Sequence, residues 1–385
     1  MNKLPDGWEI KKLKDICTIQ DGIHKTPKYT SKGIKFVSVE NINDLYNSNK
    51  FISEEDYNKM YKIKAKKNDI FMTRIGDIGT PAILNKDEKL AYYVTLCLFT
   101  NIDEEVFNKY LYYAIQSNYF KKELYHRTLH VAFPKKINLG DIGDCKFILP
   151  TLDEQKRIAS ALSKIDAYLE NTIKLIEEKE RFKRGIAKKL LTCKEGENIP
   201  EARFKGFEDE WKTKTLENIC KNIKTGKLNA NAMEKDGQYR FYTCAKDYYK
   251  INTYAFDGEA ILISGNGDHV GYVHYYNGKF NAYQRTYVLM DFTENILFIK
   301  YYLDIHLKYK INIENNKGNI PYIVLNTIKD MEIKFPSLEE QEKIGGYLSL
   351  LDEEIDNLKK QKELIKEMKR GAMQKLLSGE VRLLE

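Results

Sequence analysis

The feature that most constrains this 385-residue chain is a long helical pattern that occurs twice. Pro150-Thr-Leu-Asp-Glu-Gln-Lys-Arg-Ile and Pro336-Ser-Leu-Glu-Glu-Gln-Glu-Lys-Ile each open an amphipathic run, and these runs continue to Lys-Leu-Leu at 189–191 and 375–377. The copies lie too far apart for the stacked repeats of a solenoid, so each copy must border a whole domain. The sequence therefore predicts two similar halves, each a globular domain followed by a long helix.

Shorter landmarks repeat in the globular parts in the same order. The matched pairs are Trp8 and Trp211, Leu13 and Leu216, Ile16 and Ile219, Cys17 and Cys220, Ala91-Tyr92 and Ala282-Tyr283, and Phe133-Pro134 and Ile320-Pro321. Few identities lie between these landmarks. Such divergence is expected when one scaffold carries two different recognition surfaces, although neutral drift also produces it.

Both helical runs carry an apolar stripe in alternating steps of three and four residues. The first stripe contains Ile158, Leu162, Ile165, Leu169 and Ile176, and the second contains Ile344, Leu348, Leu351, Ile355, Leu358 and Ile365. This spacing is typical of a coiled coil, and the simplest partner for each stripe is the other copy. A coiled coil that joins two copies of the chain, unrelated to DNA, is the alternative.

The start and the length of each helix can also be predicted. Thr151 with Glu154, and Ser337 with Glu340, fit the capping box that opens a helix. Roughly forty residues at about 1.5 Å per residue give a rod of about 60 Å. Such a rod is longer than one turn of duplex DNA, about 34 Å, and can act as a ruler.

The composition favours a folded protein and leaves its partner open. The formal charge is +7 with a pI near 8.7, which suits a surface that contacts phosphates but also an ordinary solvated surface. The 27 tyrosines suit contacts with bases, although biased codon usage also enriches tyrosine. Six scattered cysteines form no C-x-x-C pair, so neither a metal site nor a disulfide framework is indicated. Without an apolar signal segment, we expect a cytoplasmic protein.

Together these motifs resemble the specificity subunit of type I restriction-modification systems over essentially the whole chain. The resemblance rests on Leu4-Pro5-Asp6-Gly7-Trp8, on Arg203-Phe204-Lys-Gly206-Phe207-Glu-Asp-Glu-Trp211, and on the repeated Pro-x-Leu-x-Glu-Gln-x-x-Ile. It implies an α+β protein with pseudo-two-fold symmetry, in which two similar target recognition domains are separated by two long antiparallel helices that form a coiled coil. The expected parts are recognition domains at 1–149 and 207–335, helices at 150–193 and 336–385, and a linker at 194–206.

The resemblance also implies that catalysis belongs to partner chains. An adenine methyltransferase needs an Asn/Asp-Pro-Pro-aromatic loop for a flipped base, and Asn319-Ile320-Pro321-Tyr322 lacks the first proline. Gly265-Asn-Gly267-Asp-His-Val-Gly271 does not fit a dinucleotide fingerprint and is interpreted as a hairpin loop. His126 and His130 have helical spacing, but no third ligand is evident, so we predict no metal site and no catalytic residue.

Candidate DNA-binding residues are polar and basic side chains of types that suit base edges: Arg and Lys for guanine, Asn and Gln for adenine. In the first half they are Lys25, Lys28, Tyr29, Thr73, Arg74, Arg127 and Lys135, and in the second half Lys224, Lys227, Tyr242, Ser264, Asn266, Gln284 and Arg285. Near the helix starts, Glu154, Gln155, Glu340 and Gln341 are candidates for contact with a partner protein.

The functional expectation is a non-catalytic subunit that binds a bipartite target in double-stranded DNA. Its expected partners are two modification (methyltransferase) subunits and restriction (motor-nuclease) subunits. The chain itself holds no cofactor, whereas the complex would use S-adenosylmethionine, with ATP and Mg²⁺ for restriction. The alternatives are a free-standing DNA-binding regulator that dimerises through its coiled coil, and the specificity chain of a fused nuclease-methyltransferase system.

Overall fold

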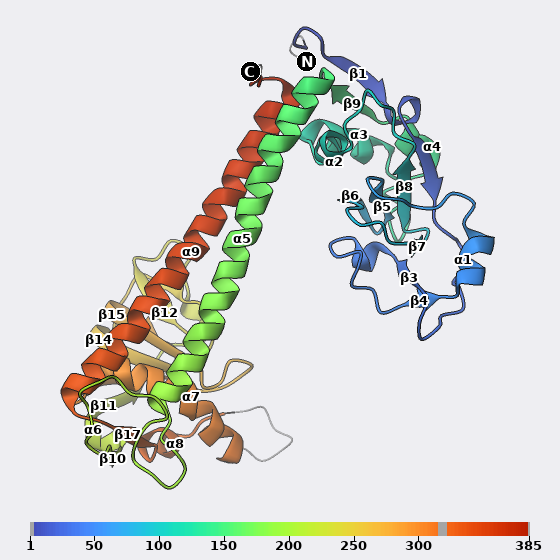
Figure 1. The fold of residues 1–385 in the computed structure, drawn as a ribbon. Helices are drawn as coiled ribbons and strands as arrows, with labels where there is room; N and C mark the ends of the chain where they lie inside the picture. The colour runs from blue at the N-terminus through green and yellow to red at the C-terminus, as the bar shows by residue number, and fades with distance from the viewer. Residues whose placement is uncertain (1–3, 315–321, 384–385) are drawn as a thin grey trace. The chain divides into compact units, whose positions relative to one another are not determined.

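The computed structural model describes residues 4–314 and 322–383, which divide into two compact units. Unit 1 comprises Met1–Thr172 with Gln361–Glu385, and unit 2 comprises Ile173–Lys360. Each unit combines antiparallel and mixed sheets with helices, which confirms the α+β class (Figure 1). No helix among the described residues has the length and apolar character needed to cross a membrane.

Unit 1 contains three small sheets. Their strand orders are β1-β9, β2-β8-β5-β6 and β4-β3-β7. The strands are β1 (Glu9–Lys12), β2 (Thr18–Asp21), β3 (Ile34–Val37), β4 (Phe51–Ile52), β5 (Ile70–Ile75), β6 (Asp77–Ile83), β7 (Leu90–Tyr92), β8 (Leu96–Thr100) and β9 (Lys146–Leu149). The short helices are η1 (Leu13–Asp15), η2 (Val39–Asn41), α1 (Glu54–Met60), α2 (Asn108–Ile115), α3 (Asn118–Arg127) and α4 (Leu139–Gly143). Helix α2 packs against β6, and α3 packs against β9.

Unit 2 repeats this framework around one larger sheet. Its strand orders are β10-β17 and β11-β16-β14-β15-β12-β13. The strands are β10 (Lys212–Thr215), β11 (Cys220–Thr225), β12 (Tyr239–Tyr242), β13 (Tyr249–Ile251), β14 (Phe256–Ser264), β15 (Val273–Ala282), β16 (Thr286–Phe292) and β17 (Glu332–Phe335). The helices are α6 (Leu216–Ile219), η3 (Ala230–Ala232), α7 (Ile296–Glu314) and α8 (Leu325–Lys329). Helix α7 packs against β14 and β15.

The two frameworks correspond strand by strand, with one main difference. In unit 2, β15 pairs antiparallel with β14 and its end pairs parallel with β12, so a single strand connects both parts of the sheet. In unit 1 the same pairings are made by two separate strands, β6 with β5 and β7 with β3. The polar segment 84–89 lies between β6 and β7 and splits the sheet into two.

Each unit has its own hydrophobic core, to which the long helices contribute. Ile158 and Leu162 of the first helix are buried with α2 and α3, as are Leu376 and Leu377 of the second helix. In unit 2, the buried side chains of α7 pack with buried side chains from both long helices. Those from the long helices are Ala187, Leu190, Leu191, Ile344, Leu348 and Leu351. Most of the predicted apolar stripe is therefore buried.

The long helices are α5 (Leu152–Leu191) and α9 (Leu338–Ser378), and each unit contains a part of both (Figure 1). In unit 1, Lys369 of α9 binds Asp166 of α5 at 2.6 Å. In unit 2, Lys179 binds Glu354 at 2.7 Å and Lys359 binds Glu180 at 2.8 Å. Further pairs give the direction: Tyr168 contacts Gln361 in unit 1, and Lys183 binds Asp352 in unit 2. Compared with Asp166–Lys369 and Glu180–Lys359, the residue numbers run in opposite directions along the two helices, so the helices are antiparallel.

Candidate nucleic-acid interface

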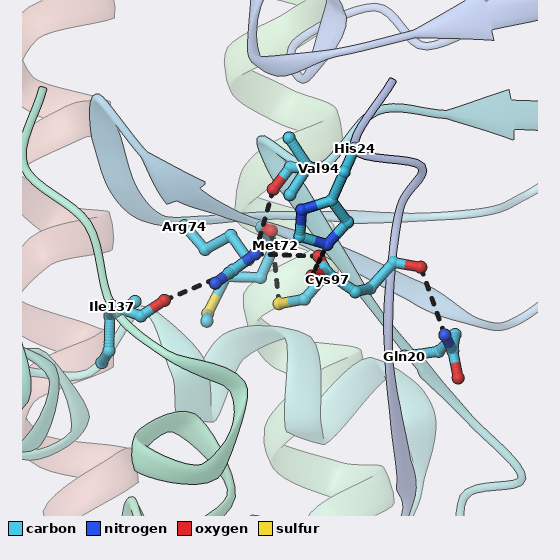
Figure 2. A network of polar contacts seen from close by, with 8 residues as sticks. Gln20, His24, Met72, Arg74, Val94, Cys97 and Ile137 are labelled. Carbon is cyan, nitrogen blue, oxygen red and sulfur yellow. Dashed lines mark hydrogen bonds and ion pairs between the residues drawn. The ribbon is translucent and has the colours of Figure 1, made fainter. Parts of the chain in front are cut away.

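Arg74 lies at the end of β5, where it is buried and bound inside unit 1 (Figure 2). Its Nη1 donates to Asp21 Oδ1 at 2.8 Å and to the Val94 carbonyl at 3.3 Å, and its Nε donates to the Ile137 carbonyl at 3.1 Å. A base could reach this guanidinium only by displacing these acceptors. In the structure Arg74 joins the end of β5 to β2, and base reading by Arg74 stays a prediction.

Three other predicted DNA contacts are also buried. The Thr73 hydroxyl donates to Asp77 Oδ2 at 3.0 Å and accepts from the Thr80 amide at 2.9 Å. Tyr242 is 2% exposed, and its hydroxyl accepts from Arg240 Nη1 at 3.2 Å. Ser264 is fully buried, and its hydroxyl has no hydrogen-bond partner. These side chains shape the strand ends and do not offer a free polar edge to DNA.

The remaining candidates of unit 1 lie on two exposed segments. Lys25, Lys28 and Tyr29 are exposed between β2 and β3, where the Tyr29 ring lies 5.6 Å from Phe36, edge to face. Arg127 is half-buried at the end of α3 and binds Glu123 at 3.0 Å. Lys135 is exposed in the loop between α3 and α4, and its carbonyl accepts from the Gly76 amide at 2.8 Å.

The loop between α3 and α4 also shows how His126 and His130 lie relative to each other. Helix α3 ends at Arg127, so His130 lies beyond the helix, and its Nε2 is 2.8 Å from the Tyr125 carbonyl. The two rings therefore do not share a helical face. Within the described residues, no group of three His, Cys, Asp or Glu side chains is placed to hold a metal ion.

The remaining candidates of unit 2 gather at one end of the large sheet, and all of them except the half-buried Asn266 are exposed. Lys224 and Lys227 flank the end of β11, Asn266 begins the loop between β14 and β15, and Gln284 and Arg285 precede β16. Backbone bonds bring these loops together. The Gly265 amide donates to the Arg285 carbonyl at 2.9 Å, and the Gln284 amide donates to the Leu228 carbonyl at 2.9 Å.

A small pocket opens among these loops. It has a volume of about 320 Å³ and is lined by Thr225, Gly265, Gln284, Arg285, Tyr287 and Ile323. The segment 265–272 is a hairpin connection between the antiparallel strands β14 and β15, which confirms that interpretation. The shared turn predicted at Ile320-Pro321 lies outside the described residues.

Two glycines position these loops, and their roles were not predicted. A Cβ atom on Gly22 would lie 2.3 Å from the Tyr93 carbonyl oxygen, and one on Gly226 would lie 1.9 Å from the Ala282 carbonyl oxygen. No other residue fits where two backbones approach so closely. A sequence signal existed, because each glycine directly follows the second strand after its Trp landmark.

Arg240 was also missed. Its guanidinium carbon lies 4.2 Å from the ring centroid of Tyr248 and 4.3 Å from that of Tyr276. Stacking between aromatic rings favours a guanidinium over an ammonium group. The three side chains belong to separate segments, so sequence spacing did not indicate their contact.

The four candidates at the helix starts are buried. The Gln155 side chain accepts from the Phe107 amide at 2.8 Å and donates to the Pro150 carbonyl at 2.9 Å. Gln341 makes the matching bonds to the Asn295 amide at 3.0 Å and the Pro336 carbonyl at 3.0 Å. Together with Glu154 and Glu340 they are at most 1% exposed and join each helix to its own domain, and their contact with a partner protein stays a prediction.

The two glutamates bind arginines instead of closing a capping box. Glu154 accepts from Arg382 at 2.9 and 3.1 Å and from Trp8 Nε1 at 2.9 Å. Glu340 accepts from Arg203 at 2.9 and 2.8 Å. Burial raises the pKa of Glu154, but hydrogen bonds from Arg382 and Trp8 outweigh it, so the pKa is lowered. Each arginine follows the end of the other long helix, a reciprocity that was not predicted.

Comparison with known proteins gives one consistent result. A family model described as the type I restriction modification DNA specificity domain matches residues 5–178 and 208–367. The type I restriction enzyme EcoDI specificity subunit of Escherichia coli is 40% identical over 170 residues, which span 44% of this chain and 37% of that protein. The putative type I restriction enzyme MjaX specificity subunit of Methanocaldococcus jannaschii is 27% identical over 100% of this chain and 96% of its own.

Solved structures show the same fold. The S subunit of a type I restriction-modification system from M. genitalium has a TM-score of 0.65 at 18% identity and covers 98% of this chain and 97% of its own. A second chain, from a structural study of complex assembly and conformational transition of the type I R-M system, has a TM-score of 0.58 at 15% identity. It covers 99% of this chain and 100% of its own.

Proposed function

This chain belongs to the family of type I restriction-modification specificity subunits, and on that premise we propose that each half reads one part of a bipartite DNA target. The observation that carries the proposal is the contrast between scaffold and loops. Both units place a glycine against a carbonyl to hold loops at the same sheet end, yet the exposed side chains there differ. A common scaffold with different exposed groups suits two different half-sites.

The readers in unit 2 are proposed to be Gln284, Arg285 and Asn266, with Lys224 and Lys227 on phosphates. In unit 1 the candidates are the exposed Lys25, Lys28, Tyr29 and Lys135 and the half-buried Arg127. Amide and guanidinium groups suit base edges, whereas lysines supply sequence-independent charge contacts. The buried Thr73, Arg74, Tyr242 and Ser264 are not part of this proposal.

The helices are proposed as spacer and as docking surface for two methyltransferase subunits. Phe182 of α5 and Met368 of α9 occupy equivalent positions in the two helix copies, and they are 52% and 49% exposed. Leu175 and Leu364 are also exposed on these helices. Apolar side chains left in solvent on both copies suit two identical partners.

Catalysis is proposed to reside in those partners. S-adenosylmethionine for methylation, and ATP with Mg²⁺ for restriction, would then bind to the modification and restriction subunits. Co-purification separates this proposal from a free-standing regulator, because a specificity subunit forms a defined complex with a separate methyltransferase chain. A regulator binds DNA without one. A partner that fuses nuclease and methyltransferase would identify the third alternative.

The spacer role is tested by lengthening both helices equally. Seven helical residues are inserted between Thr172 and Ile173 and seven more between Lys360 and Gln361, which preserves the spacing of the apolar stripe. The insertions add about 10.5 Å of helix, so the unspecified gap should lengthen by up to about three base pairs at about 3.4 Å each. Genome-wide mapping of methylated adenines measures both the gap and the letters.

The control carries the same seven residues in the exposed turn at 195–197, which leaves both helices unchanged. It should methylate the original target. Altered half-site letters with an unchanged gap in the lengthened variant would contradict the proposed spacer.

A further inference from the structure

The loop between α3 and α4 of unit 1 presents two apolar side chains entirely to solvent. Val131 is 99% exposed and Phe133 is 104% exposed relative to a reference residue. Among the described residues, no other large hydrophobic side chain is more than 71% exposed. Neither side chain contributes to a core, so the fold does not explain why they are apolar.

The loop is held firmly at its base. The Leu129 amide donates to the Lys136 carbonyl at 2.8 Å, and the Ala132 amide donates to the Leu129 carbonyl at 3.3 Å. The following Ile137 amide donates to the Arg74 carbonyl at 3.1 Å. The tip therefore stands on the buried Arg74 network and needs little ordering when it binds a partner.

The surroundings of the tip are basic. Lys135 and Lys136 follow Phe133 after Pro134, and Lys121, Lys122 and His126 are exposed on α3. The loop 128–136 contains no acidic residue. Glu123 is the acidic residue of α3, and its carboxylate binds Arg127 at 3.0 Å and accepts from the Lys146 amide. The charge pattern suits a polyanion and not an acidic or apolar protein surface.

We propose that the tip formed by Val131 and Phe133 is a wedge that inserts between two base pairs of duplex DNA. Apolar side chains that enter a base step partly unstack it and bend the duplex, while neighbouring cations hold the phosphates. Flexible pyrimidine–purine steps open at the lowest cost, so the wedge adds selectivity for DNA shape. This inference rests on the proposed DNA-binding function. It adds apolar side chains to the DNA contacts, whereas recognition of base edges in the proposal uses polar and basic ones.

The test uses the full chain, with its methyltransferase subunits, on target duplexes carrying 2-aminopurine at successive steps of the half-site bound by unit 1. The wild type should raise the fluorescence at one step. Phe133→Ala should remove that signal and weaken binding about tenfold, whereas Phe133→Leu should retain most of both. Tyr309→Ala, which removes another exposed aromatic ring, should change neither.

Salt dependence separates the wedge from its basic neighbours. Phe133→Ala should leave the slope of log K for DNA binding against log salt concentration unchanged. The double variant Lys135→Ala with Lys136→Ala should make this negative slope less steep by about two. Because the side chain is exposed, thermal unfolding should be the same for wild type and Phe133→Ala.

Two results would overturn the wedge. One is a Phe133→Ala variant that binds the target as tightly as the wild type and raises the 2-aminopurine fluorescence to the same extent. The other is a Phe133→Ala variant that binds DNA as the wild type does but no longer binds the methyltransferase subunit. That result would assign the tip to a protein contact. Failure of the wild type to prefer any bipartite target would instead overturn the proposed function.

Discussion

The two units use the same strand-end position in different ways. In unit 1, Arg74 lies opposite Thr95 and binds Asp21 at the end of β2. In unit 2, the matching position opposite Thr286 is Ser264, whose buried hydroxyl has no partner. The position of Asp21 is taken by Lys224, and the next residue, Thr225, lines the small pocket beside Arg285. One scaffold therefore tolerates either a closed internal ion pair or an open pocket at the same place.

The largest expected effect comes from breaking the closed pair. Arg74→Ala takes the guanidinium from the Asp21 carboxylate, which keeps His24 Nε2 at 2.8 Å, in a site where the side chains of the pair are only 8% and 15% exposed. Unit 1 should then lose about 3 to 5 kcal/mol of stability. The double variant Arg74→Ser with Asp21→Asn, which removes both charges together, should lose much less. Urea unfolding measures this through Trp8 fluorescence in a Trp211→Phe background, because each unit holds one of the two tryptophans.

An equal loss in the single and double variants would contradict this comparison. It would mean that the arginine stabilises unit 1 through its bonds to the Val94 and Ile137 carbonyls and not through the charge pair.

The open pocket predicts an effect on DNA and not on folding. Arg285→Ala should weaken binding through one half-site only, by about 1 to 3 kcal/mol if the contact is to a base, and relax the preference for one letter. Thermal unfolding should not change, because the side chain is exposed. Competition binding against half-site variants measures the loss of affinity and the change in base preference. An equal loss of affinity on every sequence would assign Arg285 to a phosphate contact.

The smallest effect is a difference in acid sensitivity. Burial lowers the pKa of His274 and His306 in unit 2, whereas the histidines of unit 1 are all exposed. The unfolded chain then binds more protons near pH 6.5, so unit 2 loses stability as the pH falls through this value. Trp211 fluorescence during urea unfolding between pH 7.5 and about 5.5 tests this in a Trp8→Phe background.

His274→Gln with His306→Gln should flatten the pH dependence, because each glutamine can still donate to the carbonyl that the histidine contacts. A loss of stability on acidification that persists in this variant would contradict the assignment to these histidines, and Asp304, whose pKa burial raises, would act in the opposite direction.

Patterns local in sequence predicted most of the fold, and contacts distant in sequence account for the errors. The repeated period of the apolar stripe identified both long helices, and α5 and α9 begin directly after Thr151 and Ser337. The burial of Arg74 could not be predicted, because its partner Asp21 lies 53 residues away. An arginine at a strand end has the same local sequence pattern whether it faces solvent or an internal carboxylate.

The same limit applies to the helix starts. A threonine followed three residues later by a glutamate predicts a capping box. The competing partner Arg382 lies 228 residues from Glu154, so nothing near the glutamate signals it. Exposed loop residues such as Gln284 and Arg285 were identified because they directly follow the repeated Ala-Tyr landmark.

The exchange of arginines between the helix starts has a consequence for how the chain was assembled. The half that ends with α5 supplies Arg203 to Glu340, and the half that ends with α9 supplies Arg382 to Glu154. Neither half is electrostatically complete alone: each retains a buried acid that only the other's tail neutralises. The buried acid of each half therefore has its arginine only when both halves are present, whether or not one chain joins them.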